Sequence, residues 1–505
     1  MEFFVEILAT TIGLVFVAII YAKWTHTYWK RLNIPFMTTT RIWGDMENPL
    51  RPKYGLKYDI KNAYDYFKKR KLRHGGIYLI TRPVYIPIDL GLIKNIFSKD
   101  FQYFVSHGLP YDAKKDPLSA HLFNLDGEGW RNMRVKMTPT FTSGKMKNMF
   151  ETLLNCGIPM VSHVRNLIRR GESLDIKEIL ACYTTDVIGS CAFGLECNSF
   201  KDPDAEFRKY GRQVFAVSLR NKALDFLRFV LPSLTKIVYI RSVDEELEKF
   251  FMNAIKGVMD HRIENNVKRN DFIQLFLEME KKTKIEGNND NRLTFEQIAA
   301  HAFVFFLAGF ETSSTTMTFC LHELAFNQDI QSKLREEIRD TLKKNGGLFT
   351  YDAIMGMTYL DQVIQETLRK YPPVPFLMRV CTKDYKIPDS DIVLKTGTDV
   401  FVSVLGVHYD PEYYPDPQRF QPERFNEENR KKRPGFTFLP FGEGPRICIG
   451  LRFGVMQAKT GLCLLLNKYR IFPAKGEEYN IDFEPTLIIL TKRGKVLLDA
   501  EELSD

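Results

Sequence analysis

The stretch "FGEGPRICIG", residues 441–450, places one cysteine, Cys448, in a glycine-rich loop directly before an apolar helical pattern. The loop lacks the Lys-Ser/Thr pair of a phosphate-binding P-loop. A thiolate near a helix N-terminus is favoured, because the helix dipole and exposed N–H groups lower the thiol pKa. One thiolate cannot build a tetrahedral zinc site, but it can be the axial ligand of a haem iron, because the porphyrin supplies the other four donors. The alternative is a buried structural cysteine, and the rest of the chain has to decide between them.

Composition narrows the class of protein. With 505 residues and 44% hydrophobic composition the chain can bury a large core, and length alone suggests about three domains. The formal net charge of +9 indicates an acidic partner, an anionic surface or simply a basic soluble surface. No two of the eight cysteines have C-x-x-C spacing, which argues against a zinc ribbon, a c-type haem attachment and a ferredoxin site. A reducing compartment fits these cysteines better than a disulfide framework.

The N-terminal run "FFVEILATTIGLVFVAIIYA", residues 3–22, is apolar except for Glu6. At about 1.5 Å per residue it would span roughly 30 Å, the thickness of a bilayer core. Trp24, Tyr28 and Trp29 follow, where an interfacial belt would lie, together with Lys23, Lys30 and Arg31. Because the basic residues follow the apolar run, the pattern favours a retained anchor over a cleaved signal and leaves the rest of the chain cytosolic. We predict an anchor over 1–24, a polar linker over 25–50 and a catalytic domain over 51–505.

Periodicity predicts mostly helices. Thr294 and Gln297 form a capping-box start, and the apolar run to about Phe326 predicts a long helix that crosses the core. A second helix in 357–379 should stop at Pro372-Pro373, and a third begins just after Cys448. Strands are predicted at 75–90, broken by Arg82-Pro83, at 385–405 and near 485–499, and an exposed loop at 281–292.

Motifs along the chain resemble those of the cytochromes P450. The loop resembles the haem-binding signature of that family through Phe441, Gly444, Arg446, Cys448 and Gly450. Four further motifs occur in the family's order: "WRNMR" (130–134), the oxygen-activation motif "AGFETS" (308–313), "ETLR" (366–369) and "FQPERF" (420–425). The resemblance covers residues 50 to 500. It implies a haem cofactor and a mainly α fold with small β-sheets, in one large helix-rich domain behind the N-terminal anchor.

The resemblance is closer still to the insect microsomal branch that metabolises foreign compounds. It is carried by "DPLSAHLFNLDGEGWRNMRVKMTPTFTSGKMK" and "EGPRICIGLRFG". Microsomal members commonly have a proline-rich hinge after the anchor, whereas here only Pro35 remains in "NIPFMTTT". The departure leaves the stiffness of that connection open.

The resemblance also assigns cofactor-binding residues. Trp130 and Arg134 share a helix face, and a guanidinium pairs well with a haem propionate. Arg379 and Arg446 resemble the other propionate partners, although a surface salt bridge is the alternative for any single arginine. The remaining residues expected against the haem are Ala308, Phe441, Cys448 as the iron ligand, and Gly450. Glu366, Arg369 and Arg424 are expected to form a buried network that holds the loop carrying Cys448.

Glu311 and Thr312 are the predicted catalytic pair. They place an acid and a hydroxyl where protons must reach bound oxygen, and Ala308 and Gly309 leave room above a porphyrin. The alternative for Thr312 is a hydroxyl that bonds back to its own helix. His301 is expected to be a pocket wall, not a second iron ligand.

The candidate substrate-facing residues are mostly apolar, which suggests a lipophilic substrate, although an aromatic at helical spacing is more often core. As a group they are Phe123, Phe303, Val304, Phe305, Ala308, Val374, Phe376, Leu377 and Leu487. The apolar segment 226–240 is either a second membrane contact or an ordinary buried helix pair.

Taken together, the sequence predicts a membrane-anchored haem-thiolate monooxygenase of the endoplasmic reticulum that acts on lipophilic small molecules. O2 would be the co-substrate, and electrons would come from an NADPH-cytochrome P450 reductase, with cytochrome b5 as a further donor. No nucleic-acid partner is expected. A haem-thiolate isomerase or dehydratase is the first alternative, against which the intact "AGFETS" motif argues. A non-catalytic haem or lipid binder is the second.

Overall fold

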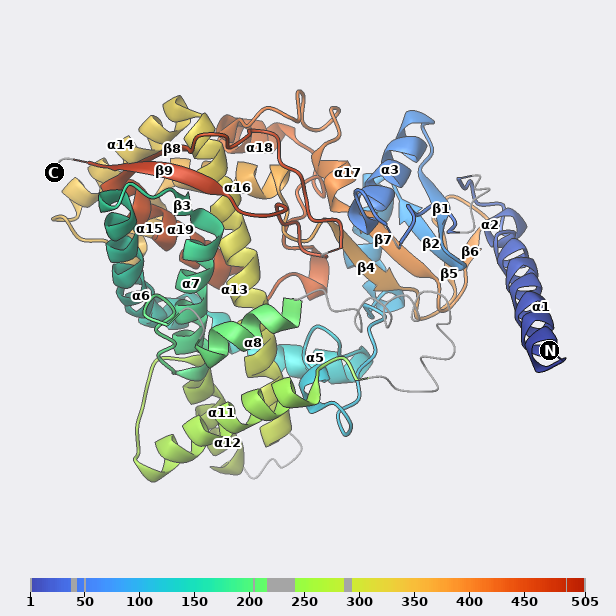
Figure 1. The fold of residues 1–505 in the computed structure, drawn as a ribbon, viewed down its shortest axis with the longest axis horizontal. Coiled ribbons are helices and arrows are strands. Elements are labelled where there is room, and N and C mark those ends of the chain that lie inside the picture. The colour runs from blue at the N-terminus through green and yellow to red at the C-terminus, as the bar shows by residue number, and fades with distance from the viewer. Residues whose placement is uncertain are drawn as a thin grey trace.

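The long helix α13 (Phe295–Phe326) runs through the helical part of the molecule (Figure 1). The computed structural model describes residues 2–37, 43–49, 51–202, 205–215, 241–285, 293–486 and 488–503. The predicted capping box is present: the Gln297 N–H donates to Thr294 Oγ1 at 3.2 Å, and the Thr294 N–H donates to Gln297 Oε1 at 3.1 Å. Most side chains of α13 are buried, as its all-round apolar sequence predicts.

Helices enclose α13 and extend along most of the chain. Figure 1 shows α7, α16 and α19 beside it, and these three pack directly against it. The helices other than α13 are α1 Glu2–Thr25, α2 Tyr28–Arg31, α3 Leu56–Lys69, α4 Leu90–Lys94, α5 Gly127–Met137, α6 Ser143–Arg169, α7 Ile176–Ile188, α8 Glu206–Phe215, α11 Glu245–Glu264, α12 Phe272–Ile285, α14 Gln328–Lys344, α15 Tyr351–Gly356, α16 Thr358–Lys370, α17 Val404–His408, α18 Glu427–Lys432 and α19 Leu451–Lys468.

A four-stranded sheet in the order β1-β2-β7-β4 lies at the other side of the molecule, next to α3. Its strands are β1 His74–Leu79, β2 Arg82–Pro87, β4 Phe376–Val380 and β7 Asp399–Ser403. β2 pairs parallel with β7, and the other pairs are antiparallel. Strand pairing was expected at 75–90, but the break falls at Ile80-Thr81, and Arg82 and Pro83 already belong to β2.

Two smaller sheets contain the remaining strands of the described residues. β3 (Leu174–Asp175), β9 (Leu497–Glu502) and β8 (Tyr469–Pro473) form one, and β5 (Tyr385–Lys386) pairs with β6 (Val393–Leu394). The predicted C-terminal strand therefore starts at Leu497, later than the pattern indicates. The predicted helix in 357–379 ends at Lys370, before Pro372, and 376–379 belong to β4. The architecture is the expected single helix-rich domain with small sheets.

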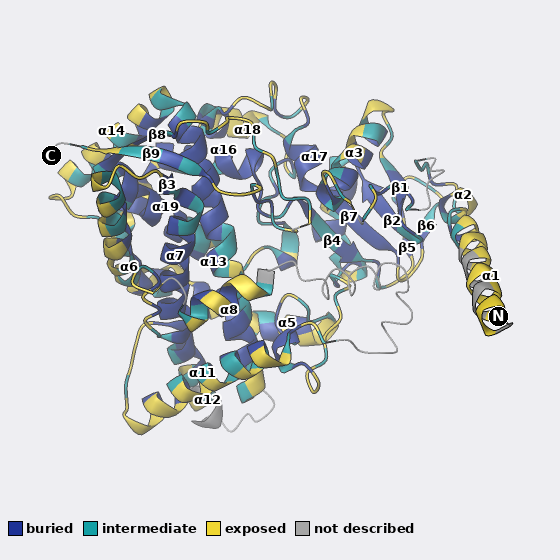
Figure 2. Ribbon diagram, viewed as in Figure 1, coloured by how far each residue is buried: buried dark blue, intermediate teal, exposed yellow. Residues whose placement is uncertain are grey.

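The segment after α1 packs against the sheet. α1 projects from the body with its side chains largely exposed (Figures 1 and 2). The expectation that Trp29 lies at a lipid interface is wrong: Trp29 is 0% exposed, and its indole N–H donates to Ile77 O at 3.0 Å. Pro35 continues this contact, because its carbonyl accepts the Gly76 N–H at 2.8 Å. The buried Trp29 ring therefore holds the segment after α1 against the sheet, without a proline-rich hinge.

No helix in the described part of the chain meets the combined length and apolarity needed to cross a membrane. The predicted second membrane contact at 226–240 and residues 286–292 of the predicted loop lie outside the described residues, whereas 281–285 belong to α12.

The burial of Trp29 can be tested against its exposed neighbour. We expect Trp29→Ala to lower the free energy of unfolding by about 3–5 kcal/mol, the usual cost of removing a buried large aromatic ring. Trp24→Ala is the matched control: Trp24 is 58% exposed, so its truncation should change stability by no more than about 0.5 kcal/mol. Denaturant unfolding of the full chain in detergent gives both values. Equal losses in the two variants would contradict the packing of Trp29.

Candidate active site

The cysteine loop, residues 439–450, is folded by its own backbone. The Cys448 N–H donates to Phe441 O at 2.9 Å, and the Gly442 N–H donates to Leu439 O at 3.1 Å. Gly444 has a φ of +74°, and a Cβ there would overlap the carbonyl oxygen of Phe97. Only glycine suits that position, because it combines a left-handed backbone with close approach of another chain segment. The loop ends at Gly450, and α19 begins at the next residue.

Cys448 differs from the other cysteines in its accessibility. Its side chain is exposed, whereas the other seven cysteines are buried or partly buried, and all eight are free thiols. Surrounding protein nevertheless raises the pKa of the Cys448 thiol, while a hydrogen bond with the Gly450 backbone and the charge of Arg134 lower it. Exposure and desolvation are compatible if the sulfur faces an internal space. An accessible thiol enclosed by protein is what an axial ligand to a flat cofactor requires.

Accessible residues also occur in the middle of α13. Ala308 is exposed and Thr312 partly exposed, although Phe305, Phe306 and Phe310 on the same helix are buried. The Thr312 hydroxyl donates to Ala308 O at 2.6 Å, which is the back-bonded geometry considered as its alternative. The proton of this hydroxyl is therefore engaged, whereas its oxygen can still accept a hydrogen bond.

Burial shifts the pKa values of Glu311 and His301 in opposite directions. Burial raises the pKa of Glu311, and the cations Lys177 and Arg208 oppose that rise. Burial lowers the pKa of His301 to about 4, so this ring is neutral near pH 7. The His301 ring hydrogen-bonds through Nδ1 to Gln297 O at 2.6 Å, within its own helix.

Two buried guanidinium groups lie at the loop, and in the described part of the chain only Arg446 of the two has an ion-pair partner, Asp126. Burial and the nearby charge of Arg446 lower the pKa of Arg379 to about 9. Burial also lowers the pKa of Arg446 to about 10, although Asp126, 3.6 Å away, opposes this shift. Within the described part of the chain, the Nε atoms of both arginines are buried and without a hydrogen-bond partner.

This cluster fits a haem. Unpaired donors in a dry environment are costly, so the site calls for added anions. The two propionates of a haem supply such anions, and guanidinium groups pair well with carboxylates. Arg379 and Arg446 would hold the propionates. Arg134 is also partly desolvated, which lowers its pKa, and it donates to Ile447 O at 2.8 Å, so it additionally braces the residue next to Cys448.

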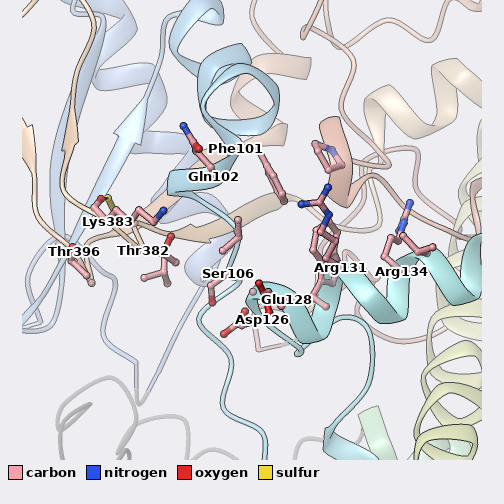
Figure 3. Close-up of a pocket in the computed structure, with 18 residues that line it drawn as sticks. Phe101, Gln102, Ser106, Asp126, Glu128, Arg131, Arg134, Thr382, Lys383 and Thr396 are labelled. Atoms are coloured by element: carbon pink, nitrogen blue, oxygen red, sulfur yellow. Dashed lines mark hydrogen bonds between the residues drawn. The ribbon is translucent and has the colours of Figure 1, made fainter. Parts of the chain in front are cut away.

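Other predicted cofactor residues lie in the same region. The Arg446 guanidinium lies over the Trp130 ring at 4.5 Å and donates to Leu125 O at 2.5 Å. Phe441 supplies the carbonyl that binds the Cys448 N–H. A groove of about 1040 Å³ adjoins these residues and is lined from α5 by Trp130, Arg131 and Arg134, and by Pro445 of the cysteine loop (Figure 3).

Sequence reasoning missed His107. Its Nδ1 lies 2.8 Å from Phe123 O and 3.4 Å from Arg446 Nη1, and its ring contacts the Phe123 ring at 4.4 Å between centroids with a tilt of 37°. Burial and the charges of Arg379 and Arg446 lower its pKa well below the usual value. No motif marks His107 in "FVSHGLPYD", because its surroundings include Arg379 and Arg446, which lie far away in the sequence.

The Glu366 carboxylate joins several segments. It is 0% exposed and accepts from Arg369 Nε at 2.7 Å and Arg369 Nη2 at 2.8 Å. The Gln421 N–H donates to it at 3.0 Å, and Arg424 Nε lies 3.3 Å away. The structure thus brings together Glu366, Arg369 and Arg424 as a buried network.

The substrate-facing candidates are distributed unevenly. Phe123 is about half exposed and lies beside the arginine cluster, and Val304, Val374 and Leu377 are partly buried. Phe303, Phe305 and Phe376 are buried in aromatic contacts with Phe251, Phe141 and Phe401, respectively. Leu487 lies outside the described residues.

Removing one cation tests the fit to a haem. Arg379→Met keeps the length of the side chain but removes its charge, so we expect haem to dissociate about tenfold faster or more. The apoprotein should be as stable as before or more stable, because an uncompensated buried charge is gone. Arg131→Met, at an exposed position of the adjoining groove, is the control. Transfer of haem to a scavenger protein measures the rate, and equal rates for the two variants would contradict the assignment.

Comparison with known proteins agrees with this geometry. Residues 51–498 match the family model "Cytochrome P450". The chain is 42% identical to "Probable cytochrome P450 6a14" of Drosophila melanogaster, over 94% of this chain and 96% of the relative. It is 40% identical to "Cytochrome P450 6A1" of Musca domestica, over 96% of each. An accessible cysteine thiol and a cluster of buried arginines are therefore found in a chain that belongs to the cytochrome P450 family of haem-thiolate monooxygenases.

Proposed function

We propose that this cytochrome P450 inserts one oxygen atom from O2 into lipophilic small molecules at the endoplasmic reticulum membrane, with its catalytic domain in the cytosol. The substrates would be foreign compounds, such as plant toxins or insecticides, or endogenous lipids. NADPH-cytochrome P450 reductase would supply electrons, with cytochrome b5 as a further donor. The observation that carries the proposal is that Ala308 is exposed and Thr312 partly exposed on a helix whose side chains are mostly buried.

The haem supplies oxygen activation, and a cysteine thiolate ligand favours O–O cleavage. Thr312 and Glu311 are the residues that would deliver protons. Thr312 Oγ1 can accept a hydrogen bond from water while its own O–H donates to Ala308 O. Burial raises the pKa of Glu311, so its carboxyl group holds a proton to a higher pH than an exposed glutamate does and can relay it. Arg208, whose charge acts on Glu311, also pairs with Glu178 at 2.7 Å, and the Glu178 side chain is 46% exposed. This charged group connects the surroundings of Glu311 to the surface.

Product yield per NADPH consumed distinguishes this proposal from its alternatives. An isomerase or dehydratase would act without NADPH, and a binder would form no product. With added reductase and a panel of lipophilic compounds, we expect substrate-dependent NADPH consumption with oxygenated products. Conversion without NADPH, or binding without any product across the panel, would overturn the proposal.

Thr312 can be compared with a second back-bonded threonine one turn later. The Thr316 hydroxyl donates to Thr312 O at 2.8 Å but is buried. We expect Thr312→Ala to keep haem and NADPH consumption within a few fold, while product per NADPH falls and peroxide rises, since proton delivery contributes about 10²- to 10⁴-fold. Thr316→Ala should lose stability with unchanged coupling. An unchanged ratio of product to NADPH in Thr312→Ala would remove Thr312 from the mechanism.

The proposed anchor rests on the apolar run Phe3–Ala22 and on the exposed large side chains of α1, among them Phe3, Phe4, Phe16 and Ile20. We expect the full chain to remain in microsomes during alkaline carbonate extraction. Removal of residues 1–24 should weaken attachment but leave haem binding intact, because Trp29 is retained. Complete release of the full chain by carbonate would contradict the anchor.

A reductase could dock near α18, where the sequence has the basic run 430–433. Lys431 pairs with Glu427 and Lys432 with Glu428, each at 2.6 Å, so the local positive charge is smaller than the run indicates. Arg433 lies over the Tyr414 and Phe425 rings at 4.7 and 4.5 Å.

If charge guides docking, reductase-driven reduction should slow as salt rises, because the Debye length falls from about 10 Å at 0.1 M to about 3 Å at 1 M. Lys431→Ala/Lys432→Ala should slow that reduction and leave peroxide-driven turnover intact. Equal loss in both assays would indicate structural damage and contradict the docking site.

A further inference from the structure

His408, the last residue of α17, lies between the Glu366 network and the cysteine loop. It is 0% exposed. On one side, its Nδ1 lies 3.0 Å from Arg369 O, and Arg369 Nη1 donates to the His408 carbonyl at 3.1 Å. On the other side, the Leu439 N–H donates to His408 Nε2 at 2.8 Å. One imidazole therefore contacts the backbones of α16 and of the cysteine loop.

The protonation of this ring follows from its partners. Arg369 O can only accept, so Nδ1 must carry the proton, and the Leu439 N–H can only donate, so Nε2 must have a lone pair. The neutral Nδ1–H tautomer meets both demands. Burial and the charge of Arg369 lower the pKa of His408 to about 3, which keeps the ring in that form near neutral pH. Stacking on Phe438, at 5.6 Å and 17°, further fixes the ring plane.

The contact leads on to the thiol through a short backbone path. Leu439, which donates to His408, also accepts the Gly442 N–H at 3.1 Å. The carbonyl of Phe441, which lies between Leu439 and Gly442 in the sequence, accepts the Cys448 N–H at 2.9 Å. The network around Glu366 does not itself contact residues 441–448 among the bonds described above. His408 supplies the link.

We propose that His408 is a positioning residue for the cysteine ligand: its Nε2, through Leu439, sets the loop geometry in which the thiolate, rather than a neutral thiol, binds haem iron. The proposal rests on the assignment of Cys448 as the axial ligand. A merely structural histidine would change stability but not the form of the bound cysteine.

Two substitutions separate the two ring nitrogens. His408→Gln can place an amide oxygen near the Nε2 position and keep the Leu439 bond, whereas His408→Asn can keep only the donor near Nδ1. Tyr469→Phe is the matched control, because it removes a bond from the Tyr469 hydroxyl to Val161 O of 2.8 Å in a distant part of the fold. The readout is the Soret band of the reduced carbon monoxide complex, normalised to total haem.

We expect the equilibrium between thiolate and thiol ligation to shift toward thiol by about two- to twelvefold in His408→Asn, the effect of one buried hydrogen bond. His408→Gln and Tyr469→Phe should stay within about twofold of the parent protein. An unchanged spectrum in His408→Asn, or equal shifts in Asn and Gln variants, would overturn the proposal. Cys448→Ser should abolish the thiolate band. Its survival would overturn the ligand assignment and the proposal with it.

A measurement on the unmodified holoenzyme covers the case in which neither variant folds. Hydrogen exchange of a peptide containing Leu439 should be slow in the native state, because the Leu439 N–H is bonded to a buried ring. Rapid exchange of that amide in the haem-loaded protein would overturn the proposal without any substitution.

Discussion

The buried carboxylate of Glu366 is the contact on which the rest of the site depends. It carries charge in a place without water, and this is tolerated because two guanidinium groups and one main-chain N–H are directed at it. Arg369 donates a hydrogen bond to the His408 carbonyl, and the His408 ring in turn accepts the Leu439 N–H. Removing one member would leave a buried charge unmatched, which typically costs about 3–5 kcal/mol. The network thus reaches the first residue of the cysteine loop through Arg369, His408 and Leu439.

Beside that loop the balance of charge is the opposite, because buried basic side chains lie close together there. Burial lowers the pKa values of Arg379, Arg446 and His107, and the charge of Arg446 lowers those of Arg379 and His107 further. Such a cluster is unfavourable in the protein alone and favourable once two carboxylates arrive. Haem binding and folding would therefore be coupled: the two propionates would supply further anions, while the cysteine loop would supply the proposed axial ligand. The enzyme's stability should be largely that of the haem-loaded form.

Local patterns predicted the elements whose cause is local. The capping box and the all-round apolar sequence define α13, Pro372 marks the end of α16, and the spacing within 441–450 locates the cysteine loop. Contacts between distant segments were not predictable. Trp29 looks like an interfacial residue until β1 covers it, and His107 and His408 have no motif because their partners lie elsewhere in the sequence. Phe303 and Phe305 of α13 are predicted as substrate-facing with burial in the core as the alternative, and helical spacing cannot distinguish a pocket from the aromatic cluster around Phe305.

The central claim is that Cys448 is the axial ligand and that the folded loop delivers it as a thiolate. X-ray absorption at the iron edge of the purified full chain tests this directly, because sulfur and nitrogen scatterers are distinguishable around iron. The account predicts one sulfur neighbour in addition to the porphyrin nitrogens, and loss of that sulfur in Cys448→Ser. An iron shell of nitrogen and oxygen only in the parent protein, or a sulfur neighbour that survives Cys448→Ser, would contradict it.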